Sequence, residues 1–143
     1  MLNSEKILNI LTANPKRVFL VDGIGALLSL FFISCILIPF QQHVGIPRST
    51  LLLIAVPPFF FVFYSLICAY FIKKKWAFYL SIISLANLLY CSVTIGLIIY
   101  HYSNLTLLGL LYFVIEIVLI LLLVYIERKT IFNISKIKSR LYH

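Results

Sequence analysis

Four long apolar runs, separated by short polar connections, dominate this chain of 143 residues. Each run would form an α-helix of roughly 33–37 Å at about 1.5 Å per residue, enough to cross a hydrocarbon core of about 30 Å. Backbone polar groups in lipid must bond to one another, which a helix achieves alone. The sequence therefore predicts an all-α, polytopic membrane protein, a four-transmembrane-helix up-down bundle forming one domain over residues 1-143. The predicted spans are 18-40, 50-72, 76-100 and 105-126.

The composition indicates lipid, rather than water, as the main solvent. Hydrophobic residues make up 63% of the chain and charged residues 11%, whereas soluble domains average about 45–50% and about 25%. The net charge of +8 does not indicate nucleic acid, because the basic residues flank the apolar runs and no nucleic-acid-binding motif appears. We expect the lipid bilayer as the main partner, and no nucleic acid.

The basic residues also predict an orientation. Of the 12 Lys and Arg residues, Arg48 alone lies in a connection on one face of a four-span topology. The other eleven precede the first span, join the second to the third, or follow the fourth. Positive charges resist translocation, so these segments belong in the cytoplasm. We therefore predict an N-in/C-in protein with both termini cytoplasmic.

The two ends of the chain have apolar residues at helical spacing, interleaved with basic ones. Residues 2-13 and 129-141 are predicted to form amphipathic helices on the cytoplasmic surface, attracted to anionic lipid by about 1 kcal/mol per basic residue. Between the first of these and the first span, Asn14 is suited to cap the span and Pro15 to occupy its first turn.

A polar seam is predicted between the third and fourth spans. Glu116 and Asn87 each lie about eleven residues into their spans, so we expect them at similar depth, with Glu116 hydrogen-bonded to Asn87 or to a neighbouring hydroxyl. Ionisable groups in the membrane centre are costly, at least about 2.5–3.5 kcal/mol on insertion scales, and each needs a physical reason. Two hypotheses stay open: a structural clamp that joins two helices, or a carboxyl that binds a proton or substrate. The same faces carry Ser84, Thr94 and Tyr112.

Asp22 lies closer to the cytoplasmic end of the first span. We expect it to act as a structural latch by pairing with Lys73–Lys75 or with Arg128 on the same side of the membrane. The residues around it are small, which favours the close approach of another helix. They are Gly23, Gly25, Ala26 and Ser29.

Two prolines, Pro57 and Pro58, lie inside the second span and remove two backbone donors, which predicts a kink or a break. The three cysteines show no paired spacing, so we expect neither a disulfide nor a metal site. No catalytic constellation of paired acids, nucleophile or metal ligands appears. We therefore predict that the chain is not an enzyme and that it uses no cofactor.

Three stretches carry a resemblance to known sequences: NPKRVFLVDGIGALLS at 14–29, ANLLYC at 86–91 and YFVIE at 112–116. They resemble a group of short four-helix bacterial membrane proteins with no assigned activity. The resemblance implies a bacterial inner (plasma) membrane and no particular chemistry. In size and in having an intramembrane glutamate, the chain is also similar to the small multidrug resistance transporters, which have that acid in the first helix rather than the last.

Two functions follow as hypotheses. The leading one is a small structural or accessory protein of the inner membrane, clamped by its buried polar residues and assembling with a second copy or another membrane protein. The alternative is a small proton-linked transporter or channel subunit that uses Glu116.

Reporters fused to each terminus test the orientation. We expect a fluorescent protein that folds only in the cytoplasm to be bright at both ends, and alkaline phosphatase, which needs the exterior, to be inactive at both. An active phosphatase fusion at either end would show that the topology is wrong.

Overall fold

The computed structural model describes residues 2–141, which contain six α-helices, one short π-helical segment and no strand. Four helical segments are long and apolar enough to cross a membrane: α2 continued by η1, then α4, α5 and α6. This finding indicates a multi-pass membrane protein. The elements are α1 (Leu2–Thr12), α2 (Pro15–Phe32), η1 (Ile33–Leu37), α3 (Gln41–Val44), α4 (Arg48–Phe71), α5 (Trp76–Tyr100) and α6 (Leu107–Leu141).

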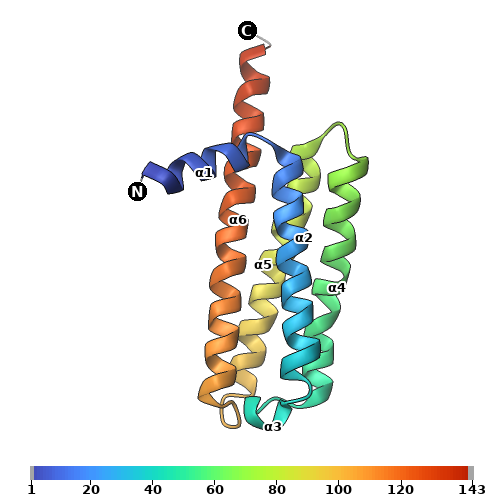
Figure 1. The fold of residues 1–143 in the computed structure, drawn as a ribbon, viewed down its shortest axis with the longest axis vertical. Helices are drawn as coiled ribbons and strands as arrows, with labels where there is room; N and C mark the ends of the chain where they lie inside the picture. The colour runs from blue at the N-terminus through green and yellow to red at the C-terminus, as the bar shows by residue number, and fades with distance from the viewer. Residues whose placement is uncertain (1, 142–143) are drawn as a thin grey trace.

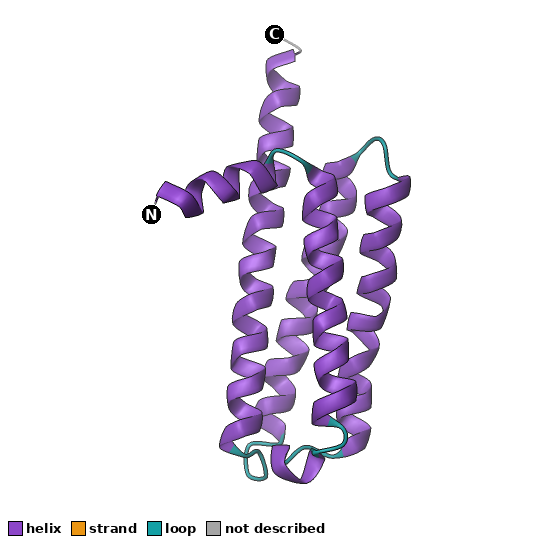
Figure 2. Ribbon diagram, in the orientation of Figure 1, coloured by secondary structure: helices purple, strands orange, loops and turns teal. Residues whose placement is uncertain are grey.

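The four long helices lie side by side, with their connections gathered at the two ends (Figures 1 and 2). Helix α1 lies across one end, where α6 continues past it, and the short α3 lies at the opposite end (Figure 1). Helix α2 packs mainly on α4, and α5 packs mainly on α6, whereas contacts between these two pairs are fewer. The fold is therefore two well-packed helix pairs set loosely against each other.

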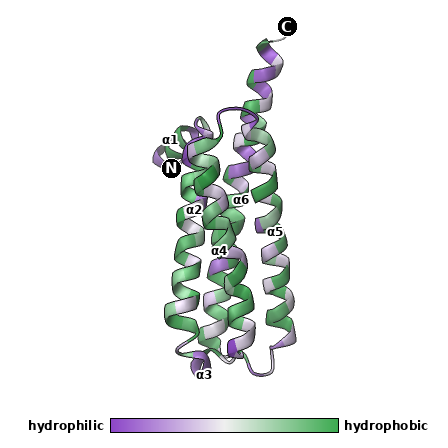
Figure 3. Ribbon diagram, turned by 90° about the vertical axis from the view of Figure 1, so that its right-hand side faces the viewer, coloured by the Kyte–Doolittle hydropathy of each residue, from purple (hydrophilic) through white to green (hydrophobic). Residues whose placement is uncertain are grey.

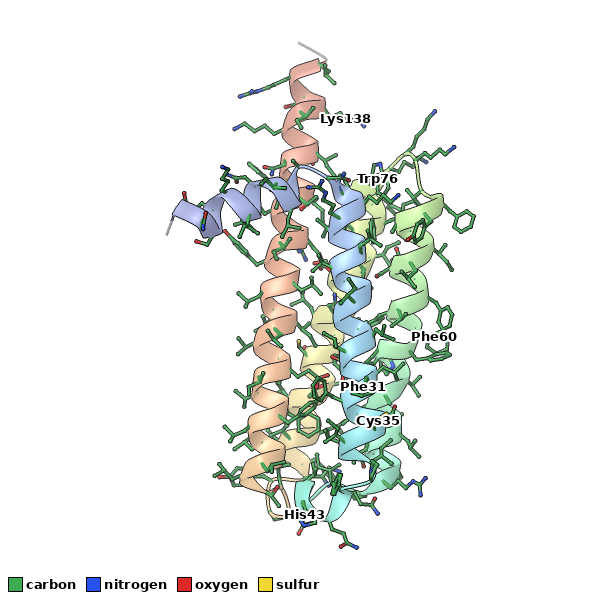
Figure 4. The ribbon with its side chains drawn as sticks, in the orientation of Figure 1. Phe31, Cys35, His43, Phe60, Trp76 and Lys138 are labelled. Carbon is green, nitrogen blue, oxygen red and sulfur yellow. The ribbon has the colours of Figure 1, made fainter. Side chains whose placement is uncertain are left out.

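The four long helices consist mostly of apolar residues along their length (Figure 3), and many of the large ones are exposed. Large side chains such as Phe31, Phe60 and Leu119 are more than half exposed. Figure 4 shows Phe60 on the outer side of α4, and Lys138 on the part of α6 that projects beyond α1. An exterior of this kind suits hydrocarbon, where exposing leucine and phenylalanine carries no penalty.

The buried apolar residues form two separate clusters, one near each end of the molecule. The cluster near α3 includes Ile33, Leu51 and Phe113. The cluster near α1 includes Phe19 and Leu80. Between the two clusters, the interior positions hold polar side chains, which are described below.

The start of α2 agrees with the predicted cap: the Asn14 side chain accepts a hydrogen bond from the Lys16 backbone N–H at 3.1 Å, and Pro15 occupies the first turn. At the opposite end, Gly45 has a φ of 82°, in the left-handed region where glycine is favoured. This turn lets the Val44 carbonyl accept a hydrogen bond from the Thr106 backbone N–H at 3.1 Å. The connection after α3 is thereby attached to the start of α6.

The third predicted span, 76-100, has the same bounds as α5. The fourth differs, because α6 continues through the predicted tail helix 129-141 as one helix of 35 residues. The tail thus extends in line with the span instead of forming a separate helix. Its first residues, such as Thr130 and Ile131, still pack against the other helices, and its end projects past α1 (Figure 1). The predicted tail has no proline or glycine after residue 126 to interrupt the helix.

Helix α4 runs without interruption through Pro57 and Pro58. A break at these residues is therefore wrong, while a kink stays a prediction. The irregularity occurs instead in the first span, where the last five residues, Ile33–Leu37, are π-helical. No proline or glycine lies in that segment, so its sequence contained no signal for it.

Replacing Gly109 with alanine tests the attachment of α3 to α6. A Cβ at this position would lie 2.5 Å from the Val44 carbonyl oxygen, so Gly109→Ala should lower the free energy of unfolding by about 1–3 kcal/mol through overpacking. The control is Gly96→Ala, because a Cβ there meets no atom within 4 Å and the better helix former should stabilise by up to about 1 kcal/mol. Unfolding in detergent measures both, and equal effects would contradict the contact.

Candidate functional site

Four polar side chains, one from each long helix, meet in the interior and are called here the inner polar cluster: Asp22 of α2, Ser65 of α4, Asn87 of α5 and Glu127 of α6. The Ser65 hydroxyl donates to Asp22 Oδ2. The Asn87 amide nitrogen donates to Asp22 Oδ1 at 2.9 Å and to Glu127 Oε1 at 3.2 Å. One amide group therefore joins acids on two other helices.

The inner polar cluster is shielded from the surroundings. Its four members are at most 3% exposed, and Glu127 is fully buried. Ser84 is also fully buried and lies beside the Glu127 carboxyl. The geometry leaves two buried atoms, Ser84 Oγ and Glu127 Oε2, without a hydrogen-bond partner. Buried polar groups are almost always satisfied, so two orphaned oxygens in one place need an explanation.

Glu116 lies three helical turns from Glu127 on the same face of α6 and forms a second polar site. Its Oε1 accepts a hydrogen bond from the Tyr90 hydroxyl at 3.2 Å. Its Oε2 is buried without a hydrogen-bond partner, although the hydroxyls of Ser29 and Tyr112 lie beside the carboxyl group. The side chain as a whole is only 5% exposed.

A cavity of about 340 Å³ lies between the two helix pairs and touches both polar sites. This volume is at the lower end of the range for small-molecule sites, roughly 300–1,000 Å³. Most of its wall is apolar. None of the residues that line it is Lys, Arg or His. The polar residues of the wall are Asp22, Ser29, Asn87, Tyr90, Tyr112 and Glu116, and its aromatic residues also include Phe32 and Phe61.

The small residues of α2 explain where this space comes from. A Cβ on Gly23 would lie 3.5 Å from the Ser65 side chain, so this glycine packs against α4 as the small-residue face predicts. Gly25, Ala26 and Ser29 instead line the cavity. Because α2 has no large side chain at these positions, the gap between the helix pairs is left unfilled.

A second, smaller cavity of about 270 Å³ lies between α4 and α5. Phe61 and Tyr90 line both cavities, with ring centroids 6.2 Å apart in an edge-to-face arrangement. Pro58 lines the first cavity and Pro57 the second. Thr94, predicted for the polar seam, lines the second cavity and donates to the Tyr90 backbone carbonyl at 2.9 Å.

Of the two partners predicted for Glu116, the neighbouring hydroxyl is the one observed. The donor is the Tyr90 hydroxyl, whereas the Asn87 amide donates to Asp22 and Glu127. The latch between Asp22 and Lys73–Lys75 or Arg128 is wrong, since the hydrogen bonds to Asp22 come from neutral partners, Ser65 and Asn87.

The sequence reasoning missed Glu127, Ser65 and Tyr90. The predicted fourth span ends at residue 126 and so leaves Glu127 outside it, yet α6 continues and buries this residue. A signal for it existed: Glu116 and Glu127 are eleven residues apart, about three full turns, and so share a face. Tyr90 likewise follows Asn87 by three residues. Ser65 had no such signal, since its position depends on how α4 packs against α2.

Among residues 2–141, no group of three or more His, Cys, Asp or Glu side chains lies close enough together to hold a metal ion. All three cysteines are free thiols, with Cys35 exposed and Cys68 and Cys91 buried. Any ligand of the sites described here would therefore be held by carboxyl, amide and hydroxyl groups and by apolar contacts.

Comparisons with known proteins do not extend this description. The chain matches no family model, no curated protein and no solved structure.

The bridging role of Asn87 is testable by truncation. Asn87→Ala would leave two buried acids without their shared donor, so the free energy of unfolding should fall by roughly 1–3 kcal/mol. The matched control is Ser92→Ala on the same helix, because Ser92 is exposed and donates to its own helix at Leu88. Detergent unfolding measures both variants. Equal stability of the two would show that the bridge does not hold the helices together.

Proposed function

We propose that this protein is a membrane-embedded carrier that binds a small, largely apolar molecule with a basic nitrogen against Glu116 and exchanges it for a proton. The observation that supports it best is the buried Glu116 carboxyl at the wall of a cavity, with one oxygen free of any hydrogen-bond partner. Glu127 also has an unpartnered oxygen, but Glu127 does not line the cavity, so the position of Glu116 distinguishes the two acids.

The cavity wall supports a cationic ligand over an anionic one. It contains two carboxyl groups, those of Asp22 and Glu116, and no basic side chain. Aromatic rings at Phe32, Phe61 and Tyr90 also line it, and ring faces attract organic cations by about 0.5–2 kcal/mol each. The remaining apolar wall suits a hydrocarbon body, which would provide most of the binding energy.

The proposed exchange needs one group only. In the empty carrier, the Glu116 carboxyl holds a proton. An arriving cation takes the place of that proton, which leaves to water, and the carboxylate then balances the charge of the ligand. The loose contact between the α2–α4 and α5–α6 pairs supports a movement of one pair against the other, which is how many carriers open alternately to the two sides.

The proposal includes a placement in the membrane. The four spans form an up-down bundle with both termini in the cytoplasm, in a bacterial inner membrane. Support comes from the eleven basic residues in the three segments assigned to that side. Helix α1 and the basic end of α6 also lie at the same end of the molecule (Figure 1).

A second candidate function is the structural or accessory role that the sequence favoured. The inner polar cluster supports it, since hydrogen bonds there join side chains of all four long helices. The two roles fall on different acids: Asp22 and Glu127 clamp the helices, and Glu116 faces the cavity.

Replacing Glu116 with glutamine separates the two functions. The probe is ethidium, an aromatic cation, whose uptake is followed by fluorescence in liposomes that are more acidic inside than outside. We expect the native protein to accelerate uptake over protein-free liposomes, and Glu116→Gln to abolish the acceleration because the amide exchanges no proton. The melting temperature in detergent should stay unchanged, since the amide oxygen still accepts from Tyr90.

The matched control is Glu5→Gln, which neutralises an exposed acid on α1 and should leave uptake at the native rate. No acceleration by the native protein would contradict a carrier for this class of cation. If Glu116→Gln lowered both the melting temperature and the uptake, the result would favour a structural role for Glu116 itself.

A further inference from the structure

The two orphaned oxygens of the inner polar cluster remain unexplained by either function. Ser84 Oγ and Glu127 Oε2 are buried, lie beside each other's side chains and make no hydrogen bond of acceptable geometry. Around them are the oxygens of Asp22 and Ser65 and the amide nitrogen of Asn87. Five side chains, from all four long helices, thus bring polar atoms together in the buried interior.

The charge of this volume is also unbalanced. Asp22 and Glu127 are both acids, and the hydrogen bonds they receive come from neutral groups, the Ser65 hydroxyl and the Asn87 amide. Within residues 2–141, no lysine, arginine or histidine side chain donates a hydrogen bond to either acid. Burying two acids without a positive partner is costly, and a bound cation would supply the balancing charge.

We propose that the inner polar cluster, together with Ser84, binds a sodium ion. Carboxylate, hydroxyl and amide oxygens are the ligands that hard cations prefer. With the Asn87 amide oxygen, the five side chains offer seven oxygens, so the charge of the site, rather than the number of ligands, favours a monovalent ion. The Asp22 and Glu127 carboxyl groups lie beside each other, which allows one proton to be shared between them. Sodium with one proton kept between the two carboxyl groups makes the site neutral.

The amide of Asn87 can face the two acids with either end. It presents two donors on nitrogen and an acceptor on oxygen. In the structure, the nitrogen faces the two acids and holds them by hydrogen bonds. Rotation of the amide group by half a turn brings the oxygen to the same place, where it serves as a ligand. The same side chain therefore closes the cluster in both states.

The position of the site gives the ion a role. Asp22 and Asn87 belong to the cluster and also line the large cavity, so a bound ion would lie at the edge of that cavity. Because its ligands come from both helix pairs, the ion would also draw the α2–α4 pair and the α5–α6 pair together. The proposal does not depend on the carrier function, and it holds for a structural protein as well.

Sodium-dependent stability of the purified full-length protein tests the site. The melting temperature in detergent is measured while NaCl replaces choline chloride at constant chloride concentration and pH. We expect a saturable rise with sodium, since a ligand of the folded state stabilises it, and no rise with choline.

The decisive variant is Ser84→Ala. The Ser84 hydroxyl makes no hydrogen bond in the structure, so the melting temperature of this variant in choline chloride should equal that of the native protein. The sodium concentration that gives half of the rise in melting temperature should increase at least about tenfold, as when a metal site loses a partner. Ser92→Ala, on the same helix but exposed, is the control and should behave as the native protein. Glu127→Gln should remove the response to sodium.

Three results would overturn the sodium site. One is equal stability in sodium and choline. Another is a sodium response that is unchanged in both Ser84→Ala and Glu127→Gln. The third is a saturable rise with CaCl₂ but not with NaCl, which would assign the site to a divalent ion. Glu116→Gln should keep the sodium response, so failure of the carrier proposal and failure of this one are distinguishable.

Discussion

The amide of Asn87 is the interaction on which the arrangement of the four long helices depends. Lipid tails are as apolar as leucine, so burying a leucine between two membrane helices gains little hydrophobic energy. Packing and hydrogen bonds between helices then decide which faces meet. The Asn87 amide nitrogen reaches Asp22 on α2 and Glu127 on α6, while Ser65 on α4 donates to Asp22. Through these bonds, side chains from all four long helices meet, with Asn87 joining α2 to α6 and Asp22 joining α2 to α4.

The hydrogen bonds of the cluster act at one depth and do not close the space between the helix pairs at the depth of Glu116. Three turns along α6 from Glu127, the two helix pairs diverge around the cavity, and the small residues Gly25 and Ala26 of α2 do not fill it. Glu116 lies at this point, with Tyr90 as its donor. The hydrogen-bonded cluster stabilises the bundle, and the cavity beside it leaves room for a ligand. We therefore assign Glu127 to stability and Glu116 to ligand binding.

The cavity and the inner polar cluster share two residues, Asp22 and Asn87. Whatever binds at one site changes the charge and hydrogen bonding seen from the other. Coupling between two ligands requires such a shared element with two arrangements, and the amide of Asn87, with its donor and acceptor ends, offers them.

The sequence by itself determined that the long helices are suited to lipid, how many of them there are, and most of their bounds. Four apolar runs of membrane length leave few alternatives, and α5 begins and ends where the run at 76-100 does. It also identified Asp22, Asn87 and Glu116 as buried acids and amides that need partners. Composition and length were sufficient for these points, because the cost of a bare polar group in lipid does not depend on how the helices are arranged.

The partners of those residues were decided only by the tertiary structure. A helix that is apolar on every side has no stripe to show which face turns inward, so the sequence left the rotation of each span open. The depth of each polar residue within the bundle was uncertain as well, because α6 continues past the end of its apolar run and Glu127 is buried there. Rotation and depth together decide whether Asn87 meets Glu116 or joins Asp22 to Glu127, and both follow from packing among helices far apart in the sequence.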